Sequence, residues 1–321
     1  MGSYLARRLL LFIPTMIFIS LIIFLLLRVV PGNAIDVLIS QQQDFQMTNE
    51  QRQILKQEMG LDKPVYEQYW LWLKGAVRFD FGHSILSSRG GRTVWDTLKN
   101  NLPRTLQLAL FSSVLGVSAG ILFGVLAGLR QDSWLDNAIR LFAVMGIAVP
   151  SFVIAVFIYY LLIRFFDWIP PIGFSNLWDD PRESLSQLIW PTLVLALGMA
   201  APMARLTRSQ FLEVYREDYI RTARAKGLSN RVITVRHALR NSLLPVLTTA
   251  GARLAGLLGG VVIVEKVFAI PGIGTQMVGA ISSRDYPTIQ AICWLMALVF
   301  MVSNLMVDLA YAWVDPRIKY S

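Results

Sequence analysis

Six long apolar runs constrain the fold of this chain more than any other feature of its sequence. Each is long enough to cross a bilayer as a helix, which takes about 20 residues. Hydrophobic residues make up 55% of the chain and charged residues only 16%, a composition that is rare in soluble domains. We therefore predict an all-α integral membrane protein with six transmembrane helices. The runs are residues 9–30, 105–128, 138–165, 188–206, 243–264 and 289–313.

Lysine and arginine positions predict which side of the membrane each loop faces, because basic residues mark cytoplasmic loops. Arg7 and Arg8 precede the first run, and the loop 207–242 carries eight lysine or arginine residues. The two loops expected on the opposite side, 166–187 and 267–288, carry one arginine each. We therefore expect both termini to be cytoplasmic. The formal net charge of +9 comes from basic residues beside apolar runs, so it does not indicate a nucleic-acid partner.

The first external segment, residues 31–104, is too long for a simple turn and is expected to form a helical subdomain. A capping box at Thr48 and Gln51 predicts a helix that ends near Met59. Pro64 suits the start of a second helix, which continues to about Phe79 and is rich in aromatic residues, as helices at a membrane interface are. A third helix is expected around residues 93–101, just before Pro103 and the second run.

Two runs carry small residues at four-residue spacing, which lets helix backbones approach closely in a bilayer. One interpretation is packing within a single subunit. The other is a subunit contact or a position beside a translocation path. The residues are Gly116, Gly120, Gly124 and Gly128 in the second run, and Gly251, Ala255 and Gly259 in the fifth.

Three residues inside the runs are unusual for membrane helices. Pro150 removes one helical hydrogen bond and predicts a kink in the third run. Arg253 lies about halfway along the fifth run and Asp308 in the inner part of the sixth. A charge at that depth is costly when it faces lipid, so Arg253 is expected either to pair with Asp308 or to face a substrate carboxylate.

The segment 218–245 is the most informative loop of the chain. Good helix formers continue from Asp218 to Lys226, and Gly227 suits the left-handed position that ends a helix. Ser229 then caps a second helix, which we expect Pro245 to stop. Two short helices with a glycine corner form a projection that another protein could grip. The alternative is a loop made basic only to fix topology.

A second distinctive string follows the fifth run, on the side opposite the basic loop. It contains Glu265, Phe268, Pro271, Gly272 and Gly274. The glycines and the proline predict a tight turn. An outer gate beside a cavity and a purely structural turn are both compatible with this string.

These segments resemble permease subunits of binding-protein-dependent ABC importers. The pattern Arg221-Thr222-Ala223-x-x-x-Gly227 is similar to their EAA motif, although Arg221 and Thr222 stand where the motif name has Glu and Ala. Those departures, and the long distance from Gly227 to Pro245, look like the dipeptide, oligopeptide and nickel branch. The strings 61–84 and 265–274 resemble its first permease subunit, and the similarity extends over nearly the whole chain.

The resemblance implies a domain organisation and a function. It implies an N-terminal tail and helix at 1–30, the external subdomain at 31–104, and a five-helix permease core at 105–313 that includes the coupling loop 207–242. A cytoplasmic tail follows at 314–321. The subdomain would contact a binding protein, guard the pore, or only anchor the first helix. The coupling residues implied to dock on ATPases are Asp218, Tyr219, Arg221, Thr222, Ala223, Arg224, Ala225, Lys226 and Gly227.

The resemblance also implies the partners and the location. The expected partners are a second homologous permease, two ATP-binding cassette ATPases, an extracytoplasmic substrate-binding protein and membrane lipid. The expected location is the cytoplasmic (inner) membrane of a bacterium or archaeon. Di- or oligopeptides are the expected substrates, with nickel chelate, glutathione or oligosaccharide as alternatives. No cofactor is expected on this chain, because ATP and magnesium would bind to the ATPases.

Missing motifs narrow the function further. The sequence contains no G-x-x-x-x-G-K-[ST] phosphate loop and no H-E-x-x-H, so we expect neither ATP hydrolysis nor catalytic residues in this chain. His83 and His237 fall on opposite sides of the predicted membrane, so no metal site is expected. A self-sufficient secondary transporter or intramembrane enzyme remains a remote alternative, because it predicts paired acids or inverted repeats that we do not find in the runs.

Overall fold

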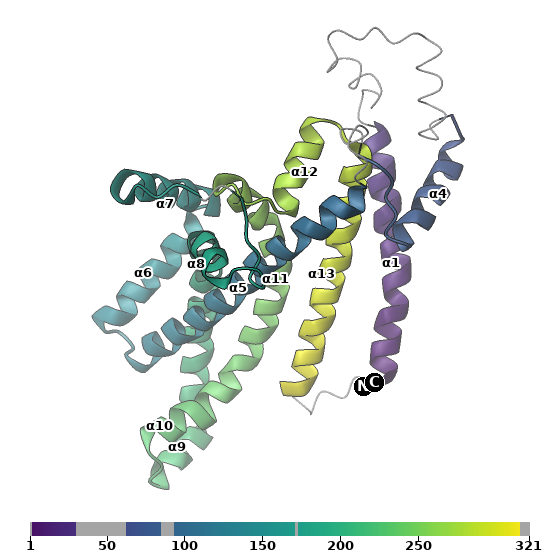
Figure 1. Cartoon of the computed structure of the whole chain (residues 1–321). Helices are drawn as coiled ribbons and strands as arrows, with labels where there is room; N and C mark the ends of the chain where they lie inside the picture. Colours follow the sequence, from purple (N-terminus) through teal and green to yellow (C-terminus); the bar gives the residue numbers. More distant parts are fainter. Residues whose placement is uncertain (1, 30–61, 85–92, 171–172, 315–321) are drawn as a thin grey trace. The chain divides into compact units, whose positions relative to one another are not determined.

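Helices make up most of the residues that the computed structural model of the protein describes, which are 2–29, 62–84, 93–170 and 173–314 (Figure 1). In these ranges, the only β-type pairing is one isolated bridge between His83 and Thr93. Four helices are long and apolar enough to cross a membrane alone, and the number rises to at most six when each of two bent helix pairs is counted as one span. The predicted all-α membrane fold is therefore confirmed.

The helices group into two compact units. Among the described residues, one unit combines the chain up to Leu102 with Thr275–Val302, and the other combines Pro103–Gly274 with residues 303–314. The elements are α1 (Gly2–Val29), α4 (Val65–Val77), α5 (Val94–Leu129), α6 (Trp134–Ala148), α7 (Ser151–Phe166), α8 (Pro181–Tyr215), α9 (Asp218–Ala225), α10 (Asn230–Val232), the π-helical segment η1 (Ile233–Leu239), α11 (Arg240–Val267), α12 (Ile273–Ser282) and α13 (Tyr286–Val314).

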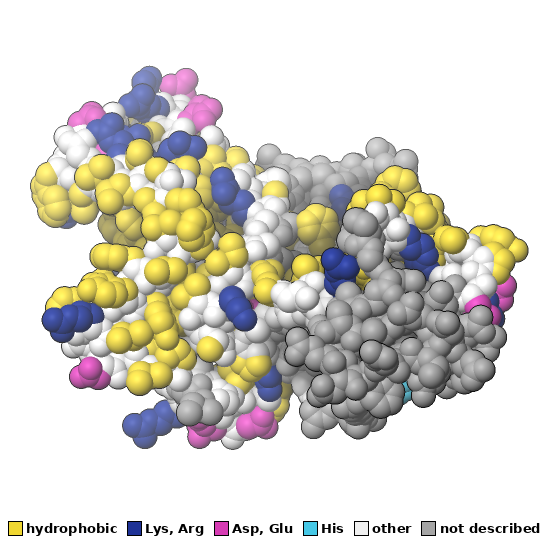
Figure 2. All heavy atoms as spheres, turned by 90° about the horizontal axis from the view of Figure 1, so that it is seen from above, with side chains coloured by type: hydrophobic (Ala, Val, Ile, Leu, Met, Phe, Trp, Pro, Cys, Tyr) yellow, Lys and Arg dark blue, Asp and Glu magenta, His cyan; other side chains and the backbone are white. Residues whose placement is uncertain are grey.

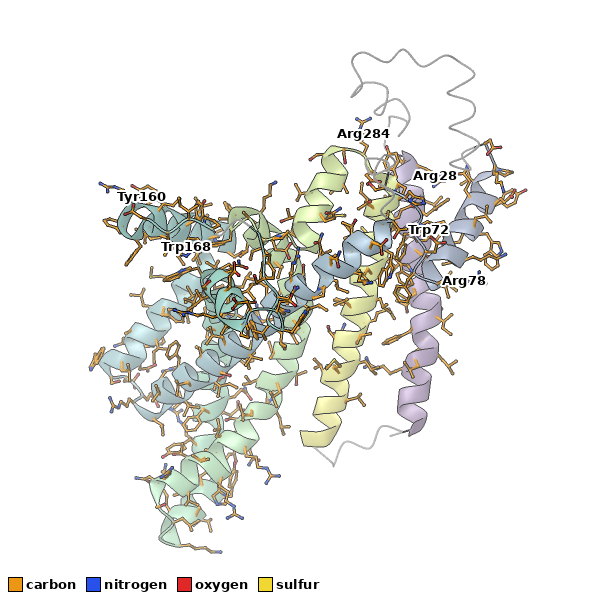
Figure 3. All side chains as sticks on the ribbon, viewed as in Figure 1. Arg28, Trp72, Arg78, Tyr160, Trp168 and Arg284 are labelled. Carbon is orange, nitrogen blue, oxygen red and sulfur yellow. The ribbon has the colours of Figure 1, made fainter. Side chains whose placement is uncertain are left out.

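In the first unit, α4 packs against α1. The Ser20 hydroxyl lies 2.8 Å from that of Tyr69, and the Arg28 guanidinium lies 3.6 Å from the centre of the Phe24 ring. Trp72 of α4 completes this aromatic group (Figure 3). The helix predicted to start at Pro64 is confirmed, and its contacts are those expected of a segment that anchors α1. The helix predicted at 48–59 lies outside the described residues.

In the second unit, the glycine ridge of α5 packs directly on α8. A Cβ built on Gly120 would lie 2.4 Å from the Cβ of Met203 and 2.9 Å from the carbonyl oxygen of Ala200. The same close approach holds along the ridge from Gly116 to Gly128. The α5 ridge therefore serves packing within one subunit. Of the ridge in the fifth run, Gly251 faces Val307 of α13, whereas a Cβ at Gly259 would meet no described atom within 4 Å.

The third apolar run is broken into two helices, so the prediction of a kink within one helix was wrong. The chain leaves α6 at Ala148 and starts α7 at Ser151, and the two helices meet at an angle of 104°. Val149 is extended, the conformation that a following proline favours by crowding the helical region of the residue before it. Pro150 then occupies the N-cap of α7. Pro150 also lacks the N–H that would donate to α6, so the two helices are separate.

Two other prolines do not end helices, which corrects two expectations. The helix expected at 93–101 is the first part of α5, which continues through Pro103. The helix expected to stop at Pro245 instead continues as α11 to Val267. A proline removes one backbone donor, and in a membrane protein neighbouring groups can compensate for that loss. This helix begins as α10 and passes through η1, whose backbone has π-helical geometry, before it continues as α11.

Large apolar side chains remain exposed on the helices, as a lipid-facing surface requires. On α1, only 11% of the most apolar window is buried within the chain. On α7, the exposed side chains include Phe152, Phe157 and Tyr160. Apolar side chains also cover much of the face seen in Figure 2. The chain is thus a multi-pass membrane protein.

Candidate functional site

The basic loop contains a short helix that ends in a tight glycine turn. After α9, Gly227 adopts φ +78°. Its N–H donates to the carbonyl of Arg224 at 2.9 Å, and the N–H of Leu228 donates to that of Ala223 at 3.3 Å. These two bonds form a Schellman motif, which satisfies carbonyls that the helix end leaves free. The predicted role of Gly227 as the helix terminator is confirmed. Ser229 occupies the next N-cap, but its hydroxyl makes no capping bond.

One face of α9 is seated on the membrane helices. Ile220 and Ala223 are buried, and they pack in one cluster with Phe211 of α8 and with Ile233 and Ala238 of η1. Each fully buried aliphatic side chain contributes about 1.5–3 kcal/mol, so α9 is fixed to its neighbours by its apolar face. A force on α9 would therefore reach α8 and the start of α11 directly.

The opposite face of α9 is polar and open. Arg221 and Asp218 form an ion pair of 3.3 Å that remains highly exposed, so it contributes little stability. The guanidinium of Arg224 lies 4.5 Å from the centre of the Tyr215 ring. Of the predicted docking residues, only Ala223 is buried. The exposed ones are Asp218, Tyr219, Arg221, Thr222, Arg224, Ala225, Lys226 and Gly227.

A buried ion pair holds α8 near this site, and the sequence analysis missed it. Asp136 of α6 is fully buried and accepts two hydrogen bonds of 2.6 Å from Arg208. The backbone N–H of Asp132 donates to the same carboxylate. Removing one partner from a buried pair typically costs about 3–5 kcal/mol. The residue types gave no signal for this pairing, because the two partners are 72 residues apart.

The predicted outer turn is built around Glu265, which is fully buried. Thr105 donates to its Oε1 at 2.6 Å and accepts from the N–H of Ile273 at 2.8 Å. A Cβ at Gly272 would lie 2.1 Å from Oε1, and one at Gly274 would lie 2.8 Å from Oε2. A Cβ at Gly274 would also lie 2.5 Å from the Cα of Val262, so this position requires glycine, whereas at Gly272 the Glu265 carboxylate would have to move.

The rest of the outer turn is also packed. Phe268 is buried, and its ring contacts those of Tyr159 and Trp168 with centroid distances of 5.8 and 6.2 Å. The carbonyl oxygen of Pro271 accepts a hydrogen bond from Arg104 at 3.0 Å. The carboxylate of Glu265 lies at the beginning of α12, where negative charge is favoured. This geometry favours a structural turn over a gate that moves freely.

The intramembrane pair expected between Arg253 and Asp308 involves one side chain, that of Asp308, that lies outside the described ones. Arg253 is exposed on α11. Among the residues described, no group of three or more His, Cys, Asp and Glu side chains could hold a metal ion.

Comparison with known proteins decides the family. The model of the binding-protein-dependent transport system inner membrane component matches residues 120–320. The model of the N-terminal membrane component of the same transport systems matches residues 1–109. The chain belongs to this family. It is therefore the permease subunit of an ABC importer and works with other subunits of the transporter, among which a separate ATPase hydrolyses ATP.

Similar permeases cover the full length of the chain. The glutathione transport system permease protein GsiC of Escherichia coli (strain K12) is 38% identical over 324 residues, which covers 100% of both chains. The probable peptide ABC transporter permease protein y4tP of Sinorhizobium fredii is 39% identical over the same length, with the same coverage. The family resemblance inferred from the coupling loop and the outer turn is confirmed.

Solved structures share the permease fold. The inward-facing MetNI methionine ABC transporter superposes with a TM-score of 0.52 and 17% identity, covering 68% of this permease and 96% of the solved chain. An amino acid ABC transporter with histidines superposes with a TM-score of 0.50 and 17% identity, covering 70% and 94%. At this identity the likeness concerns the fold.

Proposed function

We propose that this permease forms the translocation pathway for short peptides and that α9 couples the pathway to the ATPases. The proposal rests on the packing of α9, which has a polar face directed outward and an apolar face packed on α8 and η1. A helix held in this way can be pushed by a partner without detaching from the membrane domain. The same geometry would have no use in a loop that is basic only to fix topology.

The similar permeases support a peptide substrate. One is named for glutathione and another for peptides, and glutathione is itself a tripeptide. Both substrates carry free carboxylates and amide groups, so one polar pathway would suit them. Di- or oligopeptides are the first candidate and glutathione is the second.

The working assembly contains this permease, a second homologous permease, two ATP-binding cassette ATPases and an extracytoplasmic substrate-binding protein. It lies in the bacterial or archaeal cytoplasmic membrane. This chain binds no cofactor of its own, because ATP and magnesium bind to the ATPases. When the ATPases close on ATP, they move α9. Through the cluster around Phe211, α9 shifts α8 and α11, which opens the pathway outward, and hydrolysis resets it.

Reconstitution tests this function. The complete complex in proteoliposomes, supplied with its binding protein and ATP, is expected to import radiolabelled tripeptide and glutathione. A matched preparation that carries an inactive ATPase measures passive leakage. Uptake of neither substrate above that leakage, in a complex that still hydrolyses ATP, would contradict the peptide assignment. The coupling role is tested separately in the Discussion.

The orientation proposed from the basic loop predicts a labelling pattern. In a Cys293→Ser background, an impermeant maleimide is expected to label Tyr66→Cys from outside intact cells. It is expected to label Ser229→Cys only after permeabilisation. Both native side chains are exposed, so access depends only on the side of the membrane. Labelling of position 229 from outside would reverse the orientation.

Arg253 is proposed to face the pathway. Because it is exposed on α11, Arg253→Ala is expected to leave complex yield unchanged and to lower uptake of free-carboxylate peptides about tenfold, the size of one lost charge-assisted hydrogen bond. Uptake of amidated peptides should fall less. Lys266→Ala, near the end of the same helix, is the control. Loss of yield that Asp308→Ala partly restores would instead support the structural pair.

A further inference from the structure

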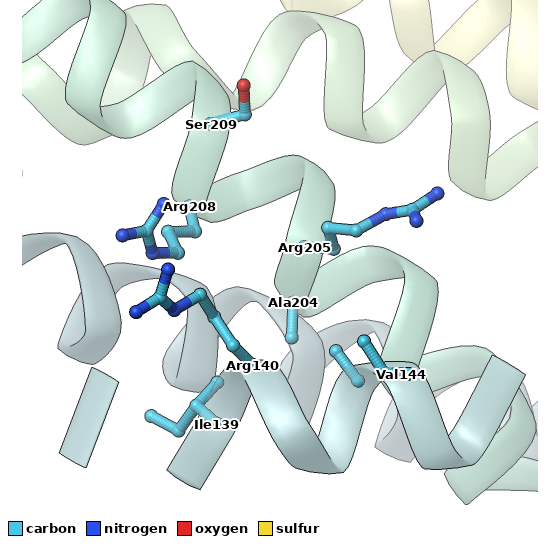
Figure 4. Close-up of a pocket in the computed structure, with 8 residues that line it drawn as sticks. Ile139, Arg140, Val144, Ala204, Arg205, Arg208 and Ser209 are labelled. Carbon is cyan, nitrogen blue, oxygen red and sulfur yellow. The ribbon is translucent and has the colours of Figure 1, made fainter. Parts of the chain in front are cut away.

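We propose that the pocket between α6 and α8 binds the headgroup of an anionic phospholipid, in the membrane leaflet on the α9 side. The pocket has a volume of about 300 Å³ and is open on one side (Figure 4). This inference goes beyond the transport function and does not depend on the substrate. The lining residues are Ile139, Arg140, Ala143, Val144, Ala204, Arg205, Arg208 and Ser209.

The charge of the pocket favours an anion. Three arginines line it, and none of the described lining residues is acidic. The nearby carboxylate of Asp136 is already occupied by two short bonds from Arg208. Arg140 reaches it only at 3.9 Å, donates to Oδ1 of Asn137 and is half exposed, while Arg205 is exposed. A guanidinium has five N–H donors, so both arginines keep donors for a phosphate, which guanidinium binds through paired hydrogen bonds.

The helices α6 and α8 are antiparallel, and on both of them the charged residues of the pocket lie toward one end and the apolar residues toward the other. Asp136 of α6 meets Arg208 of α8, whereas farther along α6 a Cβ on Gly146 would meet Ala201 of α8. The arginines therefore lie at the end of the pair nearer α9. Val144, one turn deeper on α6, is exposed.

A pocket with arginines at one end and apolar side chains at the other fits an anionic lipid better than a free anion. Arg140 lies beside Arg208, and Arg205 extends to the other side of α8 (Figure 4). Val144 and the other exposed apolar side chains of α6 form an apolar strip beside these charges. A phosphate at Arg140, with Arg205 adding a second positive charge on the other side of α8, would place its acyl chains along that strip. Basic pockets between membrane helices recognise anionic headgroups by this charge complementarity, and the apolar strip has no use for a water-soluble phosphate.

The test counts lipid bound to the purified complex. By native mass spectrometry, the wild-type complex is expected to retain one phosphatidylglycerol per copy of this chain in preference to phosphatidylcholine with the same acyl chains. Arg140→Gln combined with Arg205→Gln should weaken that retention about 30-fold, the effect of two charges near a membrane surface. Arg130→Gln, an exposed arginine outside the pocket, is the matched control and should change nothing.

Two further measurements separate the occupants. Val144→Trp fills the apolar part without changing charge, and it too should expel the lipid. Millimolar inorganic phosphate should not displace phosphatidylglycerol. Equal retention by the wild type and the double variant, or displacement by free phosphate, would overturn the proposal. So would a disulfide cross-link from Val144→Cys to the second permease, because a protein would then occupy this face.

Discussion

Gly227→Val is expected to uncouple ATP hydrolysis from transport while leaving the membrane domain folded. Gly227 adopts φ +78°, a conformation that costs an L-residue about 1–2 kcal/mol and a β-branched residue more. A Cβ built there meets no described atom within 4 Å. The effect therefore comes from the backbone alone, through loss of the turn that sets the direction of the chain after α9.

The open space around Gly227 provides a matched control. Asparagine tolerates the left-handed region far better than valine does, so Gly227→Asn should keep coupling nearly intact. The measurement is stimulation of ATP hydrolysis by the substrate-loaded binding protein in proteoliposomes. We expect at least a tenfold loss of stimulation for Gly227→Val, with normal complex yield. Normal stimulation in that variant would remove Gly227 from the coupling mechanism.

Gly124→Ala is expected to destabilise the membrane domain itself. A Cβ at this position would lie 2.5 Å from the Cβ of Thr207 and 2.7 Å from the carbonyl oxygen of Ala204. Since backbone atoms of α8 cannot rotate away, α5 and α8 must separate. Overpacking of this kind costs about 1–3 kcal/mol, which we expect to lower the melting temperature in detergent by roughly 5–10 °C.

Gly198→Ala on α8 is the matched control for this substitution. A Cβ at Gly198 would meet no described atom within 4 Å, so the same added methyl group should be harmless or slightly stabilising, because alanine favours helices. Equal melting temperatures for Gly124→Ala and Gly198→Ala would show that the α5–α8 contact does not stabilise the domain. Complex yield should follow the same order.

Composition and local chemistry were enough to predict the membrane helices and the turn at Gly227. Apolar runs of bilayer length have few other stable forms, and a glycine after a short run of helix formers predicts a helix end from neighbours in sequence alone. The EAA-like pattern lies in the same short segment. For that reason the resemblance of this loop to the family motif was recognisable before its geometry was known.

The effect of each proline on its helix could not be predicted from the sequence. Pro150 separates two helices, whereas Pro103 and Pro245 lie inside continuous ones. All three lack the same N–H, so the outcome depends on tertiary neighbours that satisfy the freed carbonyl or fail to do so. The pairing of Asp136 with Arg208 was hidden for a related reason, because only the folded chain brings these two residues together.

The break at Pro150 also affects how the protein fits its bilayer. The fifteen residues of α6 extend only about 22 Å along the helix axis, short of a hydrocarbon core of about 30 Å. After the break, α7 turns through 104° instead of continuing across. If α6 crosses the bilayer without α7, the lipid beside it has to thin locally. Hydrophobic mismatch would then make transport sensitive to acyl-chain length, with the fastest turnover in thinner membranes.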